Sequence, residues 1–337
     1  MRHIIAAIGL TLCAGLVHAF EIEEETVFEG GSNQLSILST TDTQAFAPLI
    51  TAFQIANPDV TLRYTVANSQ QVFAALQEEA AFDLAISSAM DLQLKLANDG
   101  FAKGHASTET MALPAWARWR DQLFAFAQEP VVMVASKAAF DGNPPRTRAE
   151  LIDVLRSDPA RYVGRIGTYD PVRSGAGYLF ATQDVRQSES SWRLSEVVGG
   201  LDPQLFTTSG DMIAAVQSGD LALAYNVLGS YATARLDGGD AVVIEAVDFT
   251  HVLLRTALIP RTAERADLGA AFLNFLLSTE GQRLIENETG LPRINEAALA
   301  AGPHLRPIRL DPGLLVFVDP LMRQQFLNEW TAAVVQD

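Results

Sequence analysis

The sequence predicts an α/β protein built on mainly parallel β-sheets. Within the first hundred residues, strand-like and helix-like segments alternate three times. This β-α-β-α-β-α order is typical of a parallel sheet, because each crossover to a parallel neighbour needs a long connection, usually a helix. The chain has 337 residues, of which 48% are hydrophobic, so two domains with separate cores are expected.

The first 19 residues predict a cleaved export signal. A short basic start containing Arg2 precedes an apolar segment over residues 4–17. Small or apolar residues then precede Phe20, where we expect cleavage and therefore a periplasmic protein. The apolar segment is too short to span a bilayer, and Cys13, the sole cysteine, lies inside the signal. Residues 20–32 are acidic and predict a poorly ordered leader.

Composition and motifs exclude several functions. There are 24 Lys and Arg against 40 Asp and Glu, giving a net charge of −16, whereas a nucleic-acid surface needs a basic stripe. The histidines beyond the signal are scattered singles without metal-ligand spacing. No nucleotide-binding or hydrolase signature is present. We therefore expect no cofactor, no metal and no nucleic-acid partner.

Polar residues end two strands of the first half. The expected strands cover residues 34–39, 60–66 and 82–87, with helices around 46–53, 70–80 and 90–99. Ser39, Thr40, Thr41 and Asp42 follow the first strand, and Ser87 and Ser88 end the third. In parallel sheets ligands bind beyond the carboxyl ends of strands, so both clusters are ligand-site candidates. Helix capping is an equally good explanation of these residue types.

A long β-prone run follows over residues 123–135. Pro130 interrupts it, which favours an edge strand or a strand between domains. Glu129 precedes this proline. A buried carboxylate there would either bind a cationic group of a ligand or pair with an internal arginine, and we favour the internal pair.

Residues 168–180 carry the clearest anion-binding pattern. A short strand over 161–167 leads into a loop containing Asp170 and Arg173. Ser174, Gly175, Ala176 and Gly177 then open an apolar helix. Small residues let the backbone approach a ligand, and a helix start offers free N–H groups and the positive end of the dipole. The alternatives are an ordinary helix capped by Ser174 and a solvated Arg173.

The second half continues the alternation. We expect a helix over residues 208–217, strands over 220–225, 242–247 and 251–259, an apolar helix over 267–285 and a last helix around Phe326 and Trp330. Tyr225 and Asn226 end the first of these strands and are expected to line a cleft, with core packing as the alternative.

In sequence order, six segments together resemble a known family. They are Leu38-Ser39-Thr40-Thr41-Asp42 and the segments 82–88, 129–134, 174–177, 219–225 and 271–282. The set is similar to the periplasmic solute-binding proteins of ABC importers, type II cluster, in the branch that includes ferric-iron, phosphonate and organic-anion binding proteins.

This resemblance implies two lobes joined by two crossing strands, with a small-molecule ligand in the cleft between them. Lobe one would comprise residues 33–127 plus 250–337, and lobe two residues 128–249. The crossings would lie near residues 124–135 and 246–259. Closure would be a hinge motion, and a membrane permease would receive the ligand. We expect a monomer.

The sequence departs from the iron-binding members of this family. Those carry adjacent tyrosines, whereas Tyr225 and Tyr231 here are six residues apart. A small organic anion, either a carboxylate or a phosphoryl or phosphonate compound, is therefore the first expectation, and ferric iron the second. A sensor module for a membrane receptor kinase is a further alternative. An exported hydrolase would need a nucleophile beside a base, and no such arrangement is visible.

Overall fold

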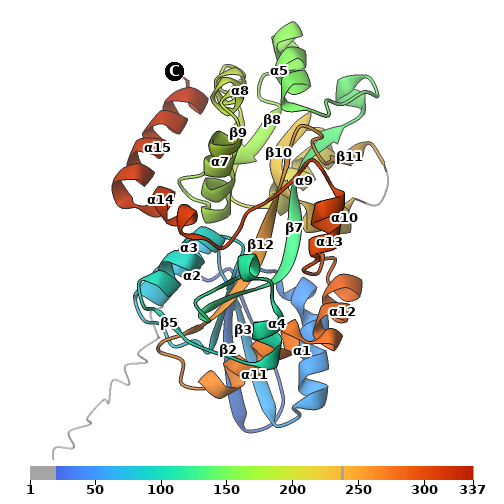
Figure 1. Ribbon diagram of the computed structural model, residues 1–337. Helices are drawn as coiled ribbons and strands as arrows, with labels where there is room; N and C mark the ends of the chain where they lie inside the picture. Colours follow the sequence, from blue (N-terminus) through green and yellow to red (C-terminus); the bar gives the residue numbers. More distant parts are fainter. Residues whose placement is uncertain (1–19, 237–238, 337) are drawn as a thin grey trace, which may run out of the picture.

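The computed structural model describes residues 20–236 and 239–336 and has an α/β architecture of two lobes (Figure 1). The expected signal, residues 1–19, lies outside the described residues. A mixed sheet runs through both lobes, with helices on its faces. The predicted fold class is therefore confirmed, including two crossing strands between the lobes.

Lobe one is organised around three parallel strands. Its elements are β1 (Glu24–Phe28), β2 (Asn33–Ser39), α1 (Thr43–Ala56), β3 (Val60–Val66), α2 (Ser69–Gln77), β4 (Leu84–Ser87), α3 (Met90–Asn98), β5 (Ala102–Lys103), α4 (Thr108–Ala112), β6 (Arg118–Trp119), α11 (Ala266–Leu277) and α12 (Thr279–Glu288). β2 is the central strand and pairs in parallel with β3 and β4. Five of the seven residues of β2 are buried, as expected for a strand covered on both faces.

Lobe two repeats this plan on a smaller sheet. Its elements are α5 (Arg148–Ser157), α6 (Pro159–Tyr162), β8 (Ile166–Tyr169), α7 (Gly175–Gln187), α8 (Ser190–Gly199), β9 (Gln204–Phe206), α9 (Ser209–Ser218), β10 (Leu223–Leu228), α10 (Gly229–Arg235) and β11 (Ala241–Ile244). β8 pairs in parallel with both β9 and β10. In both lobes the parallel strands lead into helices: β2, β3 and β4 are followed by α1, α2 and α3, and β8, β9 and β10 by α7, α9 and α10 (Figure 1).

Two long antiparallel strands, β7 (Leu123–Ser136) and β12 (Thr250–Pro260), cross between the lobes. β12 pairs with β4 in lobe one, and β7 pairs with β10 and β11 in lobe two. Pro130 marks the point of exchange, because the pairing of β7 with β12 ends at Pro130 and its pairing with β10 begins at Val131. A proline, which donates no N–H, is tolerated at such a change of partner.

The prediction of a poorly ordered leader over residues 20–32 is wrong. β1 extends the lobe-one sheet by pairing antiparallel with β3, from Glu24 opposite Val66 to Phe28 opposite Leu62. Phe20 is buried and packs edge-on against Phe82, with ring centroids 6.1 Å apart. The acidic residues that suggested disorder, Glu24 and Glu25, are exposed on this edge strand.

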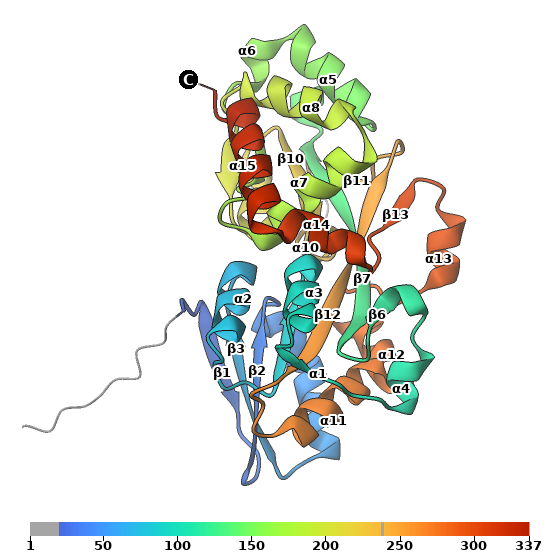
Figure 2. The same cartoon turned by 60° about the vertical axis from the view of Figure 1, so that its left-hand side comes forward.

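The assignment of the whole segment 250–337 to lobe one is also wrong at its end. After α13 (Glu296–Ala301) and β13 (Leu305–Pro307), α14 (Leu315–Val318) packs against α3 of lobe one, and α15 (Pro320–Val334) then lies along lobe two (Figure 2). Phe326 of α15 packs against Tyr178 of α7 and Trp192 of α8, with ring centroids 5.5 and 5.7 Å apart. The apolar spacing of the last helix does not reveal which lobe receives it.

No helix within residues 20–236 and 239–336 combines the length and apolarity that a membrane crossing needs.

A buried carboxyl group on α3 makes stability depend on pH. Asp91 is 2% exposed, and its carboxylate accepts a hydrogen bond from the Leu92 amide at 2.9 Å. Burial raises the pKa of Asp91 to about 7, against about 3.9 in an unfolded chain. Ionisation therefore favours unfolding progressively as the pH rises from about 4 to about 7.

We predict that Asp91→Asn raises the free energy of unfolding by about 2–4 kcal/mol at pH 8, because the variant has no charge to bury. At pH 4 the gain should vanish, since Asp91 is then neutral in both states. Urea unfolding at the two pH values measures the difference. Asp99→Asn at the exposed end of the same helix is the control, and an equal gain at both pH values would contradict the assignment.

Candidate functional site

Helix starts from both lobes surround a cavity of about 280 Å³ at the carboxyl ends of the parallel strands. Its wall contains the hydroxyl-bearing residues Thr40, Ser69, Ser88, Ser174, Thr207, Thr208 and Ser209, the charged residues Glu23, Asp42, Asp211 and Arg235, and the phenols of Tyr169 and Tyr231. The cavity is large enough for a small solute, and its lining is unusually rich in polar groups for a ligand pocket.

The lobe-one wall is formed by the starts of α1, α2 and α3. Thr40 Oγ1 accepts a hydrogen bond from the Ser88 amide at 3.1 Å, which joins the ends of β2 and β4. Asn68 caps α2 by accepting from two first-turn amides. The next residue, Ser69, accepts from the Gly175 amide of lobe two at 3.0 Å, so the two lobes are in contact here.

The lobe-two wall is formed by the starts of α7, α9 and α10. Ser174 Oγ accepts from the Gly177 amide at 3.1 Å and so caps α7, while Thr208 caps α9 in the same way. The Ser209 hydroxyl is 2.7 Å from the Tyr169 hydroxyl and accepts from the Leu228 amide at 2.9 Å. Ser174 thus has both roles that the sequence suggested, helix cap and cavity wall.

Four backbone N–H groups of the cavity wall, one in lobe one and three in lobe two, have no hydrogen-bond acceptor among the described residues. They are the first-turn amides of Ser69, Ala176, Ser209 and Gly210. A Cβ atom on Gly210 would overlap the guanidinium of Arg235, so the glycine lets this cation lie against the start of α9. Free amides, helix dipoles and a cation are the groups that hold an oxyanion.

Carboxylates share the cavity with these donors. The Tyr231 hydroxyl donates to Asp42 Oδ1 at 3.2 Å across the cleft, and Arg235 lies 3.4 Å from Asp42 Oδ2. Burial raises the pKa of Glu23, and the neighbouring charges of Asp42, Glu21 and Asp211 raise it further. These acids come from both lobes, and Arg235 is the sole cation in the cavity wall within the described part of the chain.

Five of the residues expected at the site line the cavity: Thr40, Asp42, Ser88, Ser174 and Ala176. Gly175 lies between the lobes, where a Cβ would come within 2.8 Å of Leu92 and Ser69.

Other expected site residues support the wall from behind. Ser39 accepts hydrogen bonds from the Thr41 amide and the Tyr64 hydroxyl, and Ser87 accepts from the Ala89 amide. Thr41 Oγ1 accepts from Arg255 at 2.6 Å. Each of these serines and threonines is buried, so their hydroxyls shape the helix starts.

The loop before α7 contains a turn that Asp170 stabilises and an exposed arginine, Arg173. Asp170 accepts from the amides of Ser174 and Val172, which fixes the turn. Gly177 packs against Tyr169, and a Cβ atom at position 177 would overlap the Tyr169 side chain. Arg173 lies in an outer hollow of about 540 Å³, which adjoins the cavity at Glu23.

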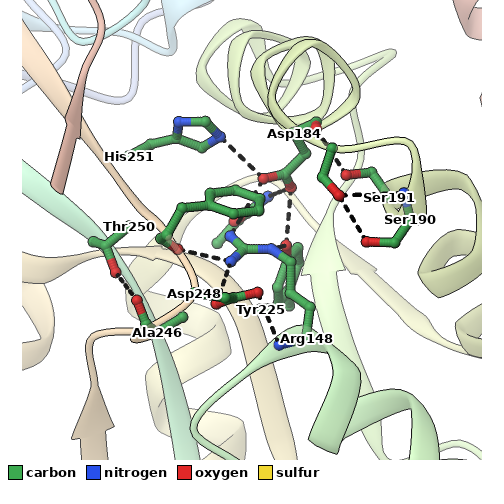
Figure 3. Close-up of polar contacts among 12 residues, drawn as sticks. Arg148, Asp184, Ser190, Ser191, Tyr225, Ala246, Asp248, Thr250 and His251 are labelled. Atoms are coloured by element: carbon green, nitrogen blue, oxygen red, sulfur yellow. Dashed lines mark hydrogen bonds and ion pairs between the residues drawn. The ribbon is translucent and has the colours of Figure 1, made fainter. Parts of the chain in front are cut away.

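Tyr225 and Asn226 do not line the cleft, contrary to the expectation. They belong to a buried polar network centred on Asp184 (Figure 3). Asp184 accepts from Asn226 Nδ2 at 2.8 Å and the Tyr225 hydroxyl at 3.0 Å, and it lies 3.1 Å from His251 Nε2. Arg148 Nε donates to the Tyr225 hydroxyl at 2.6 Å.

This network fastens the crossing strand β12 to lobe two. Arg148 on α5, Asp184 on α7 and His251 on β12 are joined through it (Figure 3). Burial alone would raise the pKa of Asp184, but the charge of Arg148 and the hydrogen bond from His251 hold it below its ordinary value. An adjoining cavity of about 50 Å³ is lined mainly by apolar side chains and is too small for a solute.

Glu129 forms the internal ion pair that the sequence favoured. Its Oε1 accepts from Arg255 Nε at 2.6 Å, and both side chains are at most 1% exposed. The other carboxylate oxygen accepts from the hydroxyl and the amide of Ser230. Because Arg255 also donates to Thr41, the pair links lobe one, both crossing strands and lobe two.

Several wall residues were missed by sequence reasoning, chiefly Glu23, Ser69, Ser209 and Arg235. Ser69 and Ser209 each follow a capping residue, which was a usable signal. Arg235 lies one helical turn after Tyr231 on α10, so the two share a face. Nothing in the sequence indicated that Glu23 would line the cavity, because its acidic segment predicted a poorly ordered leader.

Comparison with known proteins assigns the fold and the family. A family model described as bacterial extracellular solute-binding protein matches residues 35–289. The crystal structure of a substrate binding protein of an ABC transporter from Agrobacterium tumefaciens is 32% identical, with a TM-score of 0.89, covering 94% of this chain and 99% of that chain. No curated protein sequence matches the chain.

More distant structures share the fold. A periplasmic binding protein from Actinobacillus pleuropneumoniae, with fructose-6-phosphate bound, is 15% identical with a TM-score of 0.74, covering 91% of this chain and all of that chain. Iron-bound HitA from Pseudomonas aeruginosa is 19% identical with a TM-score of 0.67, covering 90% of this chain and 99% of that chain.

The two-lobed fold and its polar cleft therefore define a solute-binding protein of the type II periplasmic class. The chain belongs to the bacterial extracellular solute-binding protein family. Membership implies a location outside the cytoplasmic membrane.

We predict that Glu129→Ala lowers the free energy of unfolding by about 3–5 kcal/mol, because Arg255 would remain buried without its partner. The double variant Glu129→Leu with Arg255→Met should recover most of this loss. Urea unfolding of the single and double variants measures both effects. Glu280→Ala, which removes an exposed pair with Arg283, is the control and should change nothing measurable. A loss below about 1 kcal/mol for Glu129→Ala would contradict the buried-pair account.

Proposed function

We propose that the protein captures a small organic anion, either a carboxylate or a phosphoryl or phosphonate compound, in the inter-lobe cavity and delivers it to a membrane permease. On this proposal the first 19 residues are a cleaved signal and the mature protein works in the periplasm. The protein performs no chemistry on the solute.

The observation that carries this proposal is the set of unpartnered donors in the cavity wall. Backbone amides of Ser69, Ala176 and Ser209 are free at three helix starts, and the guanidinium of Arg235 lies against one of them. A buried N–H without an acceptor costs free energy, which an incoming oxyanion would recover. A ligand with several oxygens can accept from both lobes at once.

Contacts across the cleft support capture by closure. Ser69 meets Gly175, and Asp42 meets Tyr231 and Arg235, so polar groups of opposite lobes already touch around the cavity. A ligand that contacts both walls would bind this closed arrangement more tightly than an open one, and would therefore stabilise the closed arrangement.

Ferric iron remains the second candidate because ferric-binding proteins share the fold. The two tyrosines considered for iron lie in different places, Tyr231 in the cleft and Tyr225 in the network around Arg148. Within the described ranges no group of three His, Cys, Asp or Glu side chains has the geometry to hold a metal ion. The donors of the cavity wall favour the organic anion.

Calorimetric titration of the mature protein against carboxylates, phosphonates, sugar phosphates and ferric salts tests the choice. We expect saturable binding of one organic-anion class with a 1:1 stoichiometry. Tight binding of Fe(III) alone, with the red colour of a phenolate complex, would contradict the proposal. Copurification with a receptor kinase in place of a permease would favour the sensor role over delivery.

We predict that Ser174→Asp abolishes binding of the anion that this titration identifies. Aspartate can still cap α7, so the fold should survive, but its charge would repel an oxyanion at the same helix start. Ser278→Asp, at the cap of α12 outside the cavity, is the matched control and should bind normally. Unchanged affinity of Ser174→Asp would remove the start of α7 from the site.

A further inference from the structure

The chain passes between the lobes a third time after the two crossing strands. β13 pairs in parallel with β12, and the Leu310 amide donates to the Trp116 carbonyl of lobe one at 2.9 Å. Further on, α15 packs against α7 and α8 of lobe two through Phe326. The four residues of α14 lie between these two anchors, where the lobes meet (Figure 2). α14 is therefore placed to contact both lobes.

The last residue of α14 packs on lobe one. Val318 is 5% exposed and forms an apolar cluster with Ala89 and Leu92 at the start of α3, and Phe73 of α2 packs against this cluster. Beyond Val318, a hollow of about 520 Å³ lies between α15 and the helices α2 and α3. The contact is therefore local, and separating α14 from α3 would expose its apolar side chains to water.

Other contacts fix α14 to lobe two. The Tyr178 hydroxyl of α7 donates to the Phe317 carbonyl at 2.5 Å, and the Phe317 ring packs edge-on against Phe326 of α15, with centroids 5.9 Å apart. Asp319 directly follows α14 and caps α15 by accepting from two first-turn amides. These contacts make α14 part of the lobe-two body, so a hinge motion would separate it from α3 and leave it on α7.

The start of α7 rests on the same two residues of lobe one. A Cβ atom on Gly175 would come within 2.8 Å of Leu92 Cδ1 and 3.2 Å of the Ala89 Cβ, so the lobes approach this closely because position 175 has no side chain. Ala89, Leu92 and Val318 lie outside the cavity wall. The lobes therefore meet here through an apolar contact that a solute in the cavity does not take part in.

We propose that α14 is a latch between the lobes, which moves with lobe two and holds the cleft closed by packing Val318 on the start of α3. Opening of the cleft breaks the contact of Val318 with Ala89 and Leu92 and leaves the hydrogen bond between Tyr178 and Phe317 in place. This inference goes beyond the proposed function, because it concerns the motion between the lobes and holds for any solute.

The latch acts on capture through the balance between open and closed molecules. A contact that is made only in the closed arrangement favours that arrangement before a solute arrives. A larger closed fraction raises the apparent affinity for a solute that binds the closed arrangement, whereas entry of the solute requires the latch to release. Affinity and rate of entry are thus set in part by residues outside the cavity.

The distance between the lobes tests the latch directly. The mature protein expected here has no cysteine, because Cys13 is the sole one and lies in the expected signal. Spin labels on Glu78→Cys, at the end of α2, and on Glu329→Cys, on α15, therefore report this distance by double electron–electron resonance. Without solute we expect a short and a long distance, with the short one in the majority.

Two variants weaken the latch at its two contacts. Val318→Ala removes two methyl groups from the contact with α3, and Tyr178→Phe removes the hydrogen bond that ties α14 to α7. In each, the ratio of long to short distances should rise about threefold to tenfold. The controls are Val316→Ala, at an exposed position of the same helix, and Tyr162→Phe, which loses a hydroxyl elsewhere in lobe two. Both should match the unsubstituted protein.

Distances in Val318→Ala and Tyr178→Phe that equal those of the controls would overturn the latch, as would a mature protein that is fully open without solute. A shift of the same size in Val316→Ala would also overturn it, because the effect would then not depend on the buried contact. None of these results bears on anion capture, which the calorimetric titration decides separately.

Discussion

The ion pair between Glu129 on β7 and Arg255 on β12 connects the two crossing strands to one cleft-forming segment of each lobe. Its two charges are buried between the crossing strands, where each stabilises the other and makes a further hydrogen bond, while Arg255 Nη2 has no partner among the described residues. The further partners are Thr41 at the start of α1 and Ser230 at the start of α10. Thr41 and Ser230 are followed directly by Asp42 and Tyr231, which meet across the cleft. A requirement to satisfy two buried charges therefore also sets the spacing of the ligand-facing walls.

The chemistry of the cleft follows from the ends of parallel strands. Each strand delivers a helix start to the gap, and each start leaves backbone N–H groups that its own helix cannot satisfy. Side-chain caps such as Ser174 and Thr208 use some of these groups and leave others free. Arg235 and the acids then add selectivity to a site whose affinity comes from the backbone. The Asp184 network lies outside the cavity and joins β12 to α5 and α7 of lobe two.

Local patterns in the sequence predicted most of the strands, the helix starts and five residues of the cavity wall. Thr40 and Ser174 line the cavity because each lies between a parallel strand and the helix that follows it. The patterns failed at Tyr225 and Asn226 because the register of β10 shifts between Ala224 and Val227, and Asn226 has a φ of 63°. That irregularity turns both side chains toward Asp184. Long-range packing, such as the return of α15 to lobe two, leaves no local signal.

The central claim is that backbone amides at the helix starts hold the oxyanion of the solute. Amide proton chemical shifts of the isotope-labelled protein report such hydrogen bonds directly, because an N–H that donates to an oxyanion moves downfield. On addition of the solute, this account predicts downfield shifts for Ser69, Ala176, Ser209 and Gly210, whose amides have no acceptor among the described residues. Shifts confined to other residues, with these four amides unmoved at saturation, would contradict it.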